Sequence, residues 1–183
     1  MPRPRLVLVS GTPAAGKTTL AHEIGRLFPC PVVSRDEVKE GLVHARGDGA
    51  PSWGDPIAVD AFVLFYRIVT AYIDAGCSLV AEAAFFKDQP AAVVELLERT
   101  DAGIVHCRVD LNTAVERYAQ RASTDPARHM AHPDAELVAA MRAGTFPWER
   151  YEPMAIGVPI LTVDTSDGYN PPLNEILDFA RSR

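Results

Sequence analysis

The sequence is poor in cysteine, has fewer basic than acidic residues and contains no long uninterrupted apolar run. Its three cysteines, Cys30, Cys77 and Cys107, are odd in number and lack a C-x-x-C spacing, which argues against a disulfide framework or a zinc knuckle. Lys and Arg number 18 against 24 Asp and Glu, a net charge of −6. A nucleic-acid footprint over the whole surface is therefore not expected, although a local basic patch is compatible with this balance.

The apolar segments are too short or too charged to serve as targeting or membrane-spanning segments. The N-terminal run covers only residues 6–9, which is shorter than the hydrophobic region of a signal peptide. The longest stretch, residues 57–73, is interrupted by Asp60 and Arg67, charges that a membrane helix rarely carries. We expect a helix inside a cytoplasmic protein without a membrane partner.

The chain has the length and composition of one globular domain over residues 1–183, with 48% hydrophobic and 23% charged residues, since domains hold roughly 150 residues. Short apolar runs predict strands at residues 5–10, 31–34, 78–83, 103–109 and 158–163. Longer helical patterns predict helices at residues 17–28, 36–45, 57–75, 89–99, 113–121 and 173–181. This alternation predicts parallel βαβ units in a three-layer α/β fold, with helices on both faces of the sheet.

The most specific motif is Gly11-Thr-Pro-Ala-Ala-Gly16-Lys17-Thr18, which fits G-x-x-x-x-G-K-[ST] between a predicted strand and a predicted helix. The two glycines let the backbone curl, so that successive N–H groups and the helix N-terminus face a phosphate. Lys17 adds a positive charge near the β- and γ-phosphates of ATP, and the Thr18 hydroxyl is a ligand for Mg²⁺. The nucleotide-binding residues predicted in this loop are Gly11, Thr12, Pro13, Ala14, Ala15, Gly16, Lys17, Thr18 and Thr19.

A phosphate loop indicates a nucleoside triphosphate but not the reaction, for which three classes compete. Switch GTPases carry an N/T-K-x-D and a D-x-x-G motif, and neither occurs in this sequence. Remodelling ATPases usually have an acidic pair after the third strand and appended domains, whereas this chain has a single carboxylate there, Glu82. These differences favour a small kinase.

Ser34-Arg35-Asp36 follows the second predicted strand, and the carboxyl ends of parallel strands line the ligand crevice of such sheets. Asp36 is therefore predicted to lie beside the phosphate loop as the catalytic base that accepts the proton of an attacking hydroxyl. A helix N-cap is the alternative role, because Asp36 precedes a helical pattern. Arg35 either contacts substrate or pairs with a surface acid.

Glu82 ends the third predicted strand among small and apolar neighbours, where an isolated carboxylate is costly to bury without a partner. Contact with Mg²⁺ through water or with a substrate group would supply one, and an internal salt bridge is the alternative. Phe85 and Phe86 follow, and for them stacking on a planar substrate competes with core packing. The predicted substrate-binding residues are Arg35, Asp36, Glu82 and Phe85.

Three arginines, Arg117, Arg121 and Arg128, lie within residues 117–133 of this acidic chain and predict a small lid over ATP. Arg117 and Arg121 are four residues apart on one helix face, so both can reach the same anion, and a guanidinium group binds phosphate oxygens bidentately. A solvated helix face is the alternative. His129 and His132 are three residues apart, but no carboxylate or cysteine completes a metal site with them.

Taken together, these segments resemble the P-loop kinase group that contains polynucleotide 5′-kinases, chloramphenicol phosphotransferase and the zeta-toxin-like kinases, also described as AAA_33-type ATPases. The likeness spans nearly the whole chain. Its matching residues are 11–18, Ser34-Arg35-Asp36, the strand that ends at Glu82, the three lid arginines and Val163-Asp164-Thr165-Ser166 after the last strand.

The resemblance implies a P-loop NTPase fold, with a parallel five-stranded sheet in the order 2-3-1-4-5. It implies Asp36 as the base, Arg117 beside the adenine, Arg121 and Arg128 on phosphates, and Thr165 in a loop near the adenine. Many relatives carry Asp where this chain has Glu82, and the longer acid could change the reach toward the substrate.

The leading hypothesis is an ATP- and Mg²⁺-dependent kinase that acts on a hydroxyl of a small molecule, such as a nucleoside, an antibiotic or a sugar-like metabolite. A polynucleotide 5′-hydroxyl kinase is the runner-up, suggested by Ser-Arg-Asp but disfavoured by the scarcity of clustered basic residues outside the lid. A non-enzymatic nucleotide sensor is the third option, which would bind ATP without acceptor-dependent turnover. The sequence indicates neither the acceptor nor the oligomeric state.

Overall fold

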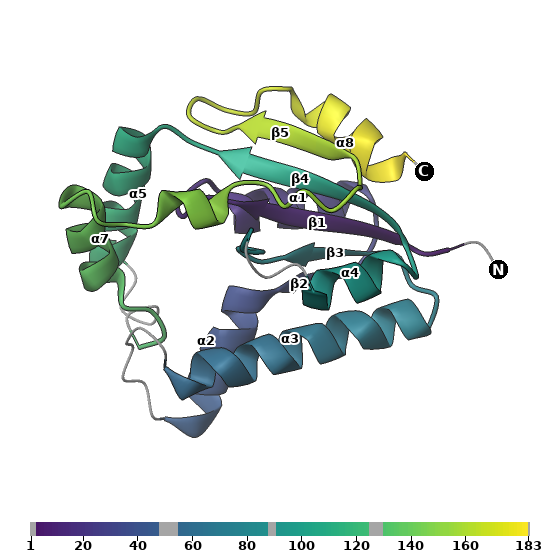
Figure 1. The fold of residues 1–183 in the computed structure, drawn as a ribbon, viewed down its shortest axis with the longest axis horizontal. Coiled ribbons are helices and arrows are strands. Elements are labelled where there is room, and N and C mark those ends of the chain that lie inside the picture. Colours follow the sequence, from purple (N-terminus) through teal and green to yellow (C-terminus); the bar gives the residue numbers. More distant parts are fainter. Residues whose placement is uncertain (1–2, 48–54, 88–90, 125–129, 183) are drawn as a thin grey trace.

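The computed structural model describes residues 3–47, 55–87, 91–124 and 130–182. Its centre is a parallel five-stranded sheet in the order β2-β3-β1-β4-β5 (Figure 1). This confirms the predicted strand order, and the ends of the strands lie within two residues of the predicted ones. The strands are β1 (Arg5–Gly11), β2 (Val32–Ser34), β3 (Leu79–Glu82), β4 (Asp101–Arg108) and β5 (Ile160–Asp164).

Every predicted helix is present, and two further helical elements, α7 and η1, lie where the apolar pattern predicts none. Charges and glycine mark α7 better than apolar spacing does: Asp134 and Glu136 lie in its first turn, Arg142 in its last, and Gly144 follows in a left-handed conformation. The helices are α1 (Lys17–Leu27), α2 (Arg35–Arg46), α3 (Pro56–Asp74), α4 (Ala91–Leu97), α5 (Leu111–Thr124), α7 (Asp134–Arg142), η1 (Trp148–Tyr151, a 3₁₀ turn) and α8 (Leu173–Arg181).

Each face of the sheet is covered by its own pair of helices, because alternate side chains of the strands point to opposite faces. Leu6 and Leu8 of β1 pack with Phe65 of α3 and with α4. Val7 and Val9 pack on the other face with α1 and α8. The result is the expected three-layer α/β arrangement (Figure 1).

Helix α3 is long and apolar enough to pass a membrane-span criterion by length and composition alone. One such helix is weak support for a membrane protein, because core helices pass the same test. Its buried positions, Ile57, Ala61, Phe65, Val69 and Ile73, follow a helical spacing along one side. This side packs into the domain, as the sequence predicts.

The helices α5 and α7 and the η1 turn form a separate apolar cluster beyond the carboxyl ends of the strands (Figure 1). The cluster is built around the buried side chains of Tyr118, Val138, Met141, Phe146 and Tyr151. The predicted lid segment, about residues 117–133, overlaps its α5 part, and residues 125–129 lie outside the described ones. The cluster therefore lies at the carboxyl ends of the strands, where the candidate site is found.

Candidate active site

The phosphate loop leaves β1 and enters α1 as the motif predicts, and two glycines make its path possible. Gly11 has φ 134°, and a Cβ atom there would lie 1.9 Å from the carbonyl oxygen of Cys107. Gly16 has φ 66° and caps the N-terminus of α1. Any larger residue at Gly11 would collide with β4 backbone, so the glycine is required for the close approach of the loop to the neighbouring strand.

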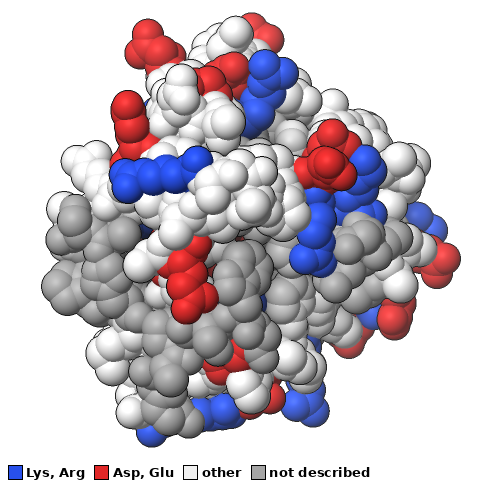
Figure 2. All heavy atoms as spheres, turned by 60° about the vertical axis from the view of Figure 1, so that its left-hand side comes forward, with Lys and Arg blue, Asp and Glu red and all other residues white. Residues whose placement is uncertain are grey.

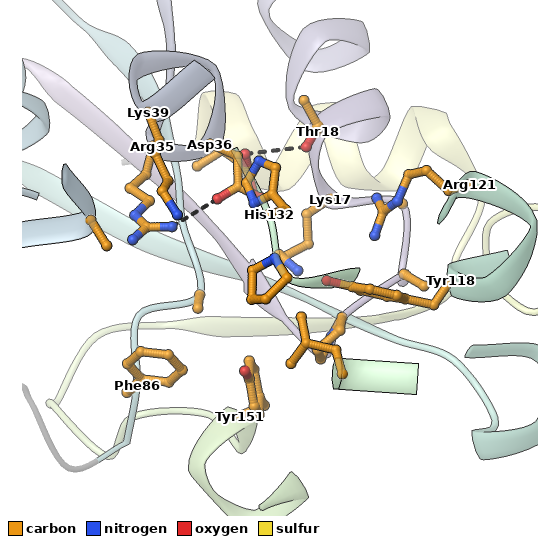
Figure 3. Close-up of a pocket in the computed structure, with 18 of the residues that line it drawn as sticks. Lys17, Thr18, Arg35, Asp36, Lys39, Phe86, Tyr118, Arg121, His132 and Tyr151 are labelled. Atoms are coloured by element: carbon orange, nitrogen blue, oxygen red, sulfur yellow. Dashed lines mark hydrogen bonds and ion pairs between the residues drawn. The ribbon is translucent and has the colours of Figure 1, made fainter. Parts of the chain in front are cut away.

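Lys17 and Thr18 begin α1 and face into a cavity next to the loop (Figure 3). The Lys17 Nζ atom donates a hydrogen bond of 2.8 Å to the carbonyl oxygen of Thr12, which holds the ammonium group over the loop. The Thr18 hydroxyl donates to Glu82 at 3.3 Å. Since its proton is engaged there, its lone pairs are directed away from Glu82 and can meet a cation.

Glu82 is buried at the end of β3, with 2% of its surface exposed. The same oxygen, Oε2, accepts hydrogen bonds from Ser34 at 2.6 Å and from Thr18. Burial raises the pKa of Glu82, and the nearby charge of Lys17 and the two hydrogen bonds lower it in part. Hydroxyl donors and the neighbouring Lys17 charge therefore take the place of the internal salt bridge considered as an alternative.

Asp36 lies in the first turn of α2 and lines the same cavity as the phosphate loop (Figure 3). Its carboxylate pairs with Arg35 at 3.0 Å, and 38% of the Asp36 side chain is exposed. The N-cap of α2 is Ser34, so the alternative role of Asp36 as the helix cap is wrong. Helix α2 starts one residue earlier than the pattern predicts, so Asp36 lies within its first turn.

The cavity has a volume of about 380 Å³ and gathers residues from four parts of the chain. The phosphate loop contributes Pro13, Ala14, Gly16, Lys17, Thr18 and Thr19. The α2–α3 side contributes Arg35, Asp36, Lys39, Ala58 and Phe62, and the end of β3 and the segment after it contribute Glu82, Ala84 and Phe86. The lid side contributes Tyr118, Arg121, His132, Pro133, Leu137, Arg150 and Tyr151.

Three predicted loop residues, Gly11, Thr12 and Ala15, support the loop from behind and do not line the cavity among its described residues. Thr12 N–H donates to the carbonyl of Cys107 at 3.3 Å and its own carbonyl accepts from Lys17. Ala15 is fully buried. These residues shape the loop, and its other residues form the surface that faces the cavity.

Of the two phenylalanines after β3, Phe86 and not Phe85 faces the cavity. Phe85 is 3% exposed and packs against Phe65 in the core, so the expected substrate contact of Phe85 is corrected to a packing role. Phe86 lines the cavity, with the Arg150 guanidinium 4.4 Å above its ring and Tyr151 against its edge. The sequence offers both residues equally, and only the fold separates them.

Arg117 and Arg121 of α5 take different directions although they are one helical turn apart. Arg121 lines the cavity with its guanidinium 4.7 Å from the Tyr118 ring centroid (Figure 3). Arg117 instead donates from Nη2 to the carbonyl oxygens of Thr165 at 2.9 Å and Ser166 at 3.0 Å. The expectation that both reach the same anion is therefore not met, because backbone carbonyls hold Arg117.

A hydrogen bond of Thr165 connects the segment after β5 to the phosphate loop. Its hydroxyl lies 3.1 Å from the carbonyl oxygen of Ala15 and 3.2 Å from that of Arg108. Together with the Arg117 contacts, this fixes the positions of α5, the β5 end and the loop relative to one another. Arg128, the third predicted lid arginine, lies outside the described residues.

Histidine contributes to the site without forming a metal centre among the described residues. His132 lines the cavity, and its Nε2 pairs with Glu40 of α2 at 3.0 Å. His106 of β4 lies beneath the loop, and its Nδ1 is 3.3 Å from the Ser10 hydroxyl. Burial, and then the charges of Lys17 and Arg108, lower the pKa of His106 to about 4.

The cavity residues that the sequence analysis does not single out include Lys39, Phe62, Arg150 and Tyr151. Lys39 follows Arg35 by one helical turn, a spacing that could have indicated it once α2 was placed. Arg150 and Tyr151 belong to η1, which the apolar pattern does not predict. No motif marks Phe62.

The comparisons with known proteins agree with this arrangement. A candidate kinase from Chloroflexus aurantiacus J-10-fl has a similar crystal structure, with a TM-score of 0.81, 28% sequence identity, and coverage of 98% of this chain and 97% of that one. The Mycobacterium tuberculosis APS kinase CysC, solved with AMPPNP and APS, has a TM-score of 0.63 at 17% identity and covers both chains fully. A gluconokinase from Sinorhizobium meliloti 1021 has a TM-score of 0.57 at 17% identity, over 98% of this chain and 91% of that one.

At these identities the two last structures show a shared fold. A search of curated proteins found no match. The family model described as an AAA domain, AAA_33, matches residues 6–147, which include the phosphate loop, Asp36, Glu82 and α5. With this match and the kinase fold of its structural neighbours, the chain belongs to the AAA_33 family, within the P-loop kinase group.

Proposed function

We propose that the protein is an ATP-dependent kinase that transfers the γ-phosphoryl group to a hydroxyl of a small molecule. The observation that carries the proposal is a single cavity with two kinds of polar group. Lys17 and Thr18 of the phosphate loop line it together with the Asp36 carboxylate of α2. A kinase needs these two functions, phosphate binding and acceptance of the acceptor proton, next to each other.

In the proposed reaction the acceptor oxygen forms a bond to the γ-phosphorus, and the bond between that phosphorus and the β,γ-bridging oxygen breaks, which releases ADP. Asp36 accepts the proton of the attacking hydroxyl. Arg35 orients the carboxylate through the ion pair of 3.0 Å. General base catalysis of this kind contributes about 10²- to 10⁴-fold to the rate.

Positive side chains on the loop and on α5 serve the phosphates of ATP. Lys17 lies over the loop, and Arg121 faces it across the cavity (Figure 3). The Nε atom of Arg121 is buried without a hydrogen-bond partner among the described residues, so a phosphate oxygen would satisfy it. Arg128 is proposed to join them from the lid, and Arg117 and Thr165 are proposed to border the adenine.

The oxygen donors beside the loop fit the Mg²⁺ ion that accompanies ATP in such kinases. Mg²⁺ prefers oxygen ligands and keeps waters and phosphate oxygens in its shell, so it needs few protein ligands. The Thr18 hydroxyl would hold the ion, and the buried carboxylate of Glu82, which accepts the Thr18 proton, would orient that hydroxyl. When bound, the ion neutralises phosphate charge.

A polynucleotide 5′-hydroxyl kinase is the second candidate, favoured by the Ser34-Arg35-Asp36 sequence before α2. On the face shown in Figure 2, however, acidic and basic side chains are interspersed over the coloured surface. A groove that follows a single strand needs a run of positive charge. This surface supports the small-molecule acceptor.

The direct test is a phosphorylation assay with labelled ATP, Mg²⁺ and a library of hydroxylated metabolites, read by mass spectrometry. We expect acceptor-dependent ADP release with equimolar phosphorylated product. Lys17→Ala removes the charge on the loop and should abolish turnover and weaken nucleotide binding while the protein stays folded. Nucleotide binding without turnover on any acceptor would favour the sensor, and unchanged turnover by Lys17→Ala would contradict the assignment of the loop.

A further inference from the structure

The side of α3 that faces away from the sheet is largely apolar. Helix α3 lies on the outside of the domain, along the lower edge of the view in Figure 1. Its buried residues make up only 28% of its apolar 18-residue stretch. Among the exposed residues are Val59, Val63 and Leu64, which are 61%, 53% and 36% exposed. Exposed apolar side chains that adjoin one another in this way mark an interaction surface.

The centre of this surface is a stripe of exposed residues with helical spacing, on the side of α3 opposite its buried residues. The exposed stripe consists of Pro56, Asp60, Val63, Leu64, Arg67 and Ala71. Its middle is apolar, an acid and a base flank the middle, and short side chains lie at both ends. With one acid and one base, the stripe has no net charge.

The exposed stripe is complementary to itself. Its midpoint lies between Val63 and Leu64, and Asp60 and Arg67 lie at equal distances from that point in opposite directions. In an antiparallel pair of helices related by a two-fold axis, each residue meets the one at the same distance on the other side of the midpoint. Val63 then meets Leu64 of the partner subunit, and Asp60 meets Arg67 of the partner subunit. Both contacts occur twice.

The two charges of the stripe can take part in such a contact. Arg67 is exposed and has no hydrogen-bond or ion-pair partner within the described ranges. Asp60 pairs with Arg46 of α2 at 2.6 Å, and both side chains are about half exposed, 51% and 45%. This pair uses only Oδ2 of Asp60, and a carboxylate has room for several donors. Arg67 of the partner subunit can therefore join Asp60 without breaking the existing pair.

A shallow groove beside the stripe gives a second helix a place to pack, as ridges of side chains on one helix pack into grooves on another. The groove has a volume of about 280 Å³ and is lined by Leu42, Arg46, Asp60, Val63, Leu64 and Arg67. A membrane surface is a poorer match for this face, because helices that lie on membranes carry several Lys and Arg residues beside their apolar side. The exposed stripe has a single Arg and an Asp.

We propose that two copies of this chain associate through the exposed stripes of their α3 helices, antiparallel about a two-fold axis at the Val63–Leu64 midpoint. The inference does not depend on the proposed kinase function. No residue of the stripe lines the candidate active site, to which α3 contributes Ala58 and Phe62. A contact built on one helix from each subunit is small, and small interfaces are weak and reversible.

Sedimentation velocity over a range of protein concentrations tests the association. We expect a species of twice the 19.9 kDa of one chain, with a dissociation constant of about 1 to 100 µM. Val63→Glu puts a charge at the centre of the contact and should raise this constant about 100-fold or more. Leu111→Glu is the matched control, because Leu111 of α5 is 51% exposed, and it should leave the constant unchanged.

Charge reversal tests the antiparallel arrangement itself. Arg67→Glu sets two acids against each other at both ends of the contact, and Asp60→Arg sets two bases against each other. Each variant alone should associate about 10-fold or more weakly than the wild-type chain, since two exposed ion pairs become repulsive. A mixture of the two variants restores both opposite-charge contacts, so it should form a heterodimer with a dissociation constant close to the wild-type value.

The proposed association is weak enough to leave measurements on the single chain undisturbed. Well below the dissociation constant the chains are monomeric, so association contributes almost nothing to the free energy of unfolding. Thermal melting at such a concentration shows whether each variant is folded before its association is measured.

Three results would overturn the proposal. The first is a chain that stays monomeric up to about 500 µM, well above the expected dissociation constant. The second is a dimer that folded Val63→Glu leaves unchanged, or a mixture of Arg67→Glu and Asp60→Arg that associates no better than either variant alone, which would place the contact elsewhere. The third is binding to phosphatidylcholine–phosphatidylserine vesicles that Val63→Glu abolishes, without self-association, which would assign the stripe to a membrane surface.

Discussion

At the scale of single residues, Glu82 links the phosphate loop side to the start of α2, since one of its oxygens accepts hydrogen bonds from both Thr18 and Ser34. We predict that Glu82→Gln raises the Mg²⁺ concentration needed for half-maximal activity by about 10- to 100-fold, the usual cost of losing an outer-shell carboxylate. KM for the acceptor should stay unchanged. A magnesium titration at saturating ATP measures the first value, and an acceptor titration at saturating magnesium measures the second.

The opposite result, an unchanged magnesium requirement with a raised acceptor KM, would indicate that Glu82 contacts the acceptor instead. Ser34→Ala serves as a control, because it removes the other hydrogen bond to the same oxygen but keeps the carboxylate. It should change the magnesium requirement less than Glu82→Gln does.

His106 gives a prediction on stability against pH. Its pKa is about 4 in the folded protein, against an ordinary value of 6.5. Between these values the unfolded chain binds more protons, so the free energy of unfolding contributed by this residue falls as the pH drops from about 6.5 toward about 4. His106→Asn can keep a hydrogen bond to Ser10 and should flatten this dependence.

Urea denaturation at several pH values in this range measures the effect, with exposed His44 replaced by Asn as the control. The relevant quantity is the difference in the free energy of unfolding between His106→Asn and the wild-type chain at each pH, since carboxylates titrate in both proteins. A parallel pH dependence of the two proteins would show that His106 is not held neutral by the fold.

The residues of the site divide into those that a motif reveals and those that only the fold reveals. Lys17 and Asp36 were predicted to share a cavity because strand ends meet at one edge of a parallel sheet, and the structure places them there. The sequence does not distinguish the roles of Phe85 and Phe86. In the structure Phe85 has a φ angle of 44° and its ring packs in the core, whereas the ring of Phe86 lines the cavity. Arg150 reaches the cavity through packing of η1, which no local pattern encodes.

At the scale of elements, the alternation of strands and helices predicts the fold well. The buried side chains recur about every 2 residues in a strand and about every 3.6 residues in a helix, so the two kinds of element can be told apart. Helix α8 has the bounds that its pattern predicts, and α3 differs by one residue at each end. The helix α7 escapes the pattern because it packs through a few positions, Val138 and Met141, onto α5 and η1 instead of the sheet. Helix α7 is therefore stabilised by these tertiary contacts.

The packing of α3 against the sheet can be tested by substitutions on its buried and exposed sides. Phe65 is fully buried between α3 and the sheet, while Val63, two residues away, is 53% exposed. We predict that Phe65→Ala lowers the free energy of unfolding by about 3–5 kcal/mol, as for other buried aromatic residues, whereas Val63→Ala changes it by less than about 0.5 kcal/mol. Equal effects of the two substitutions, measured by urea denaturation, would mean that α3 does not pack as described.

At the scale of the whole molecule, the negative net charge and the interspersed charges on the face shown in Figure 2 fit the proposed small acceptor. We predict that labelled single-stranded DNA or RNA binds, even at about 50 mM salt, no more tightly than about 10⁻⁴ to 10⁻⁶ M, the range of non-specific binding at physiological salt. Fluorescence anisotropy measures this affinity. A tighter complex that weakens steeply with salt, together with labelled 5′ ends, would favour the polynucleotide kinase.

The proposed kinase reaction depends most on Asp36 as the base in a cavity shared with the phosphate loop. Asp36→Asn keeps the size of the side chain but cannot accept a proton, and the loss of one charge in the first turn of α2 costs about 0.3–1 kcal/mol. The decisive measurement is acceptor-dependent ADP release by this variant, with thermal melting and nucleotide affinity determined on the same preparation. We predict near-normal melting and nucleotide binding, with turnover lower by about 10²- to 10⁴-fold; a folded Asp36→Asn protein with near-normal turnover would contradict the account.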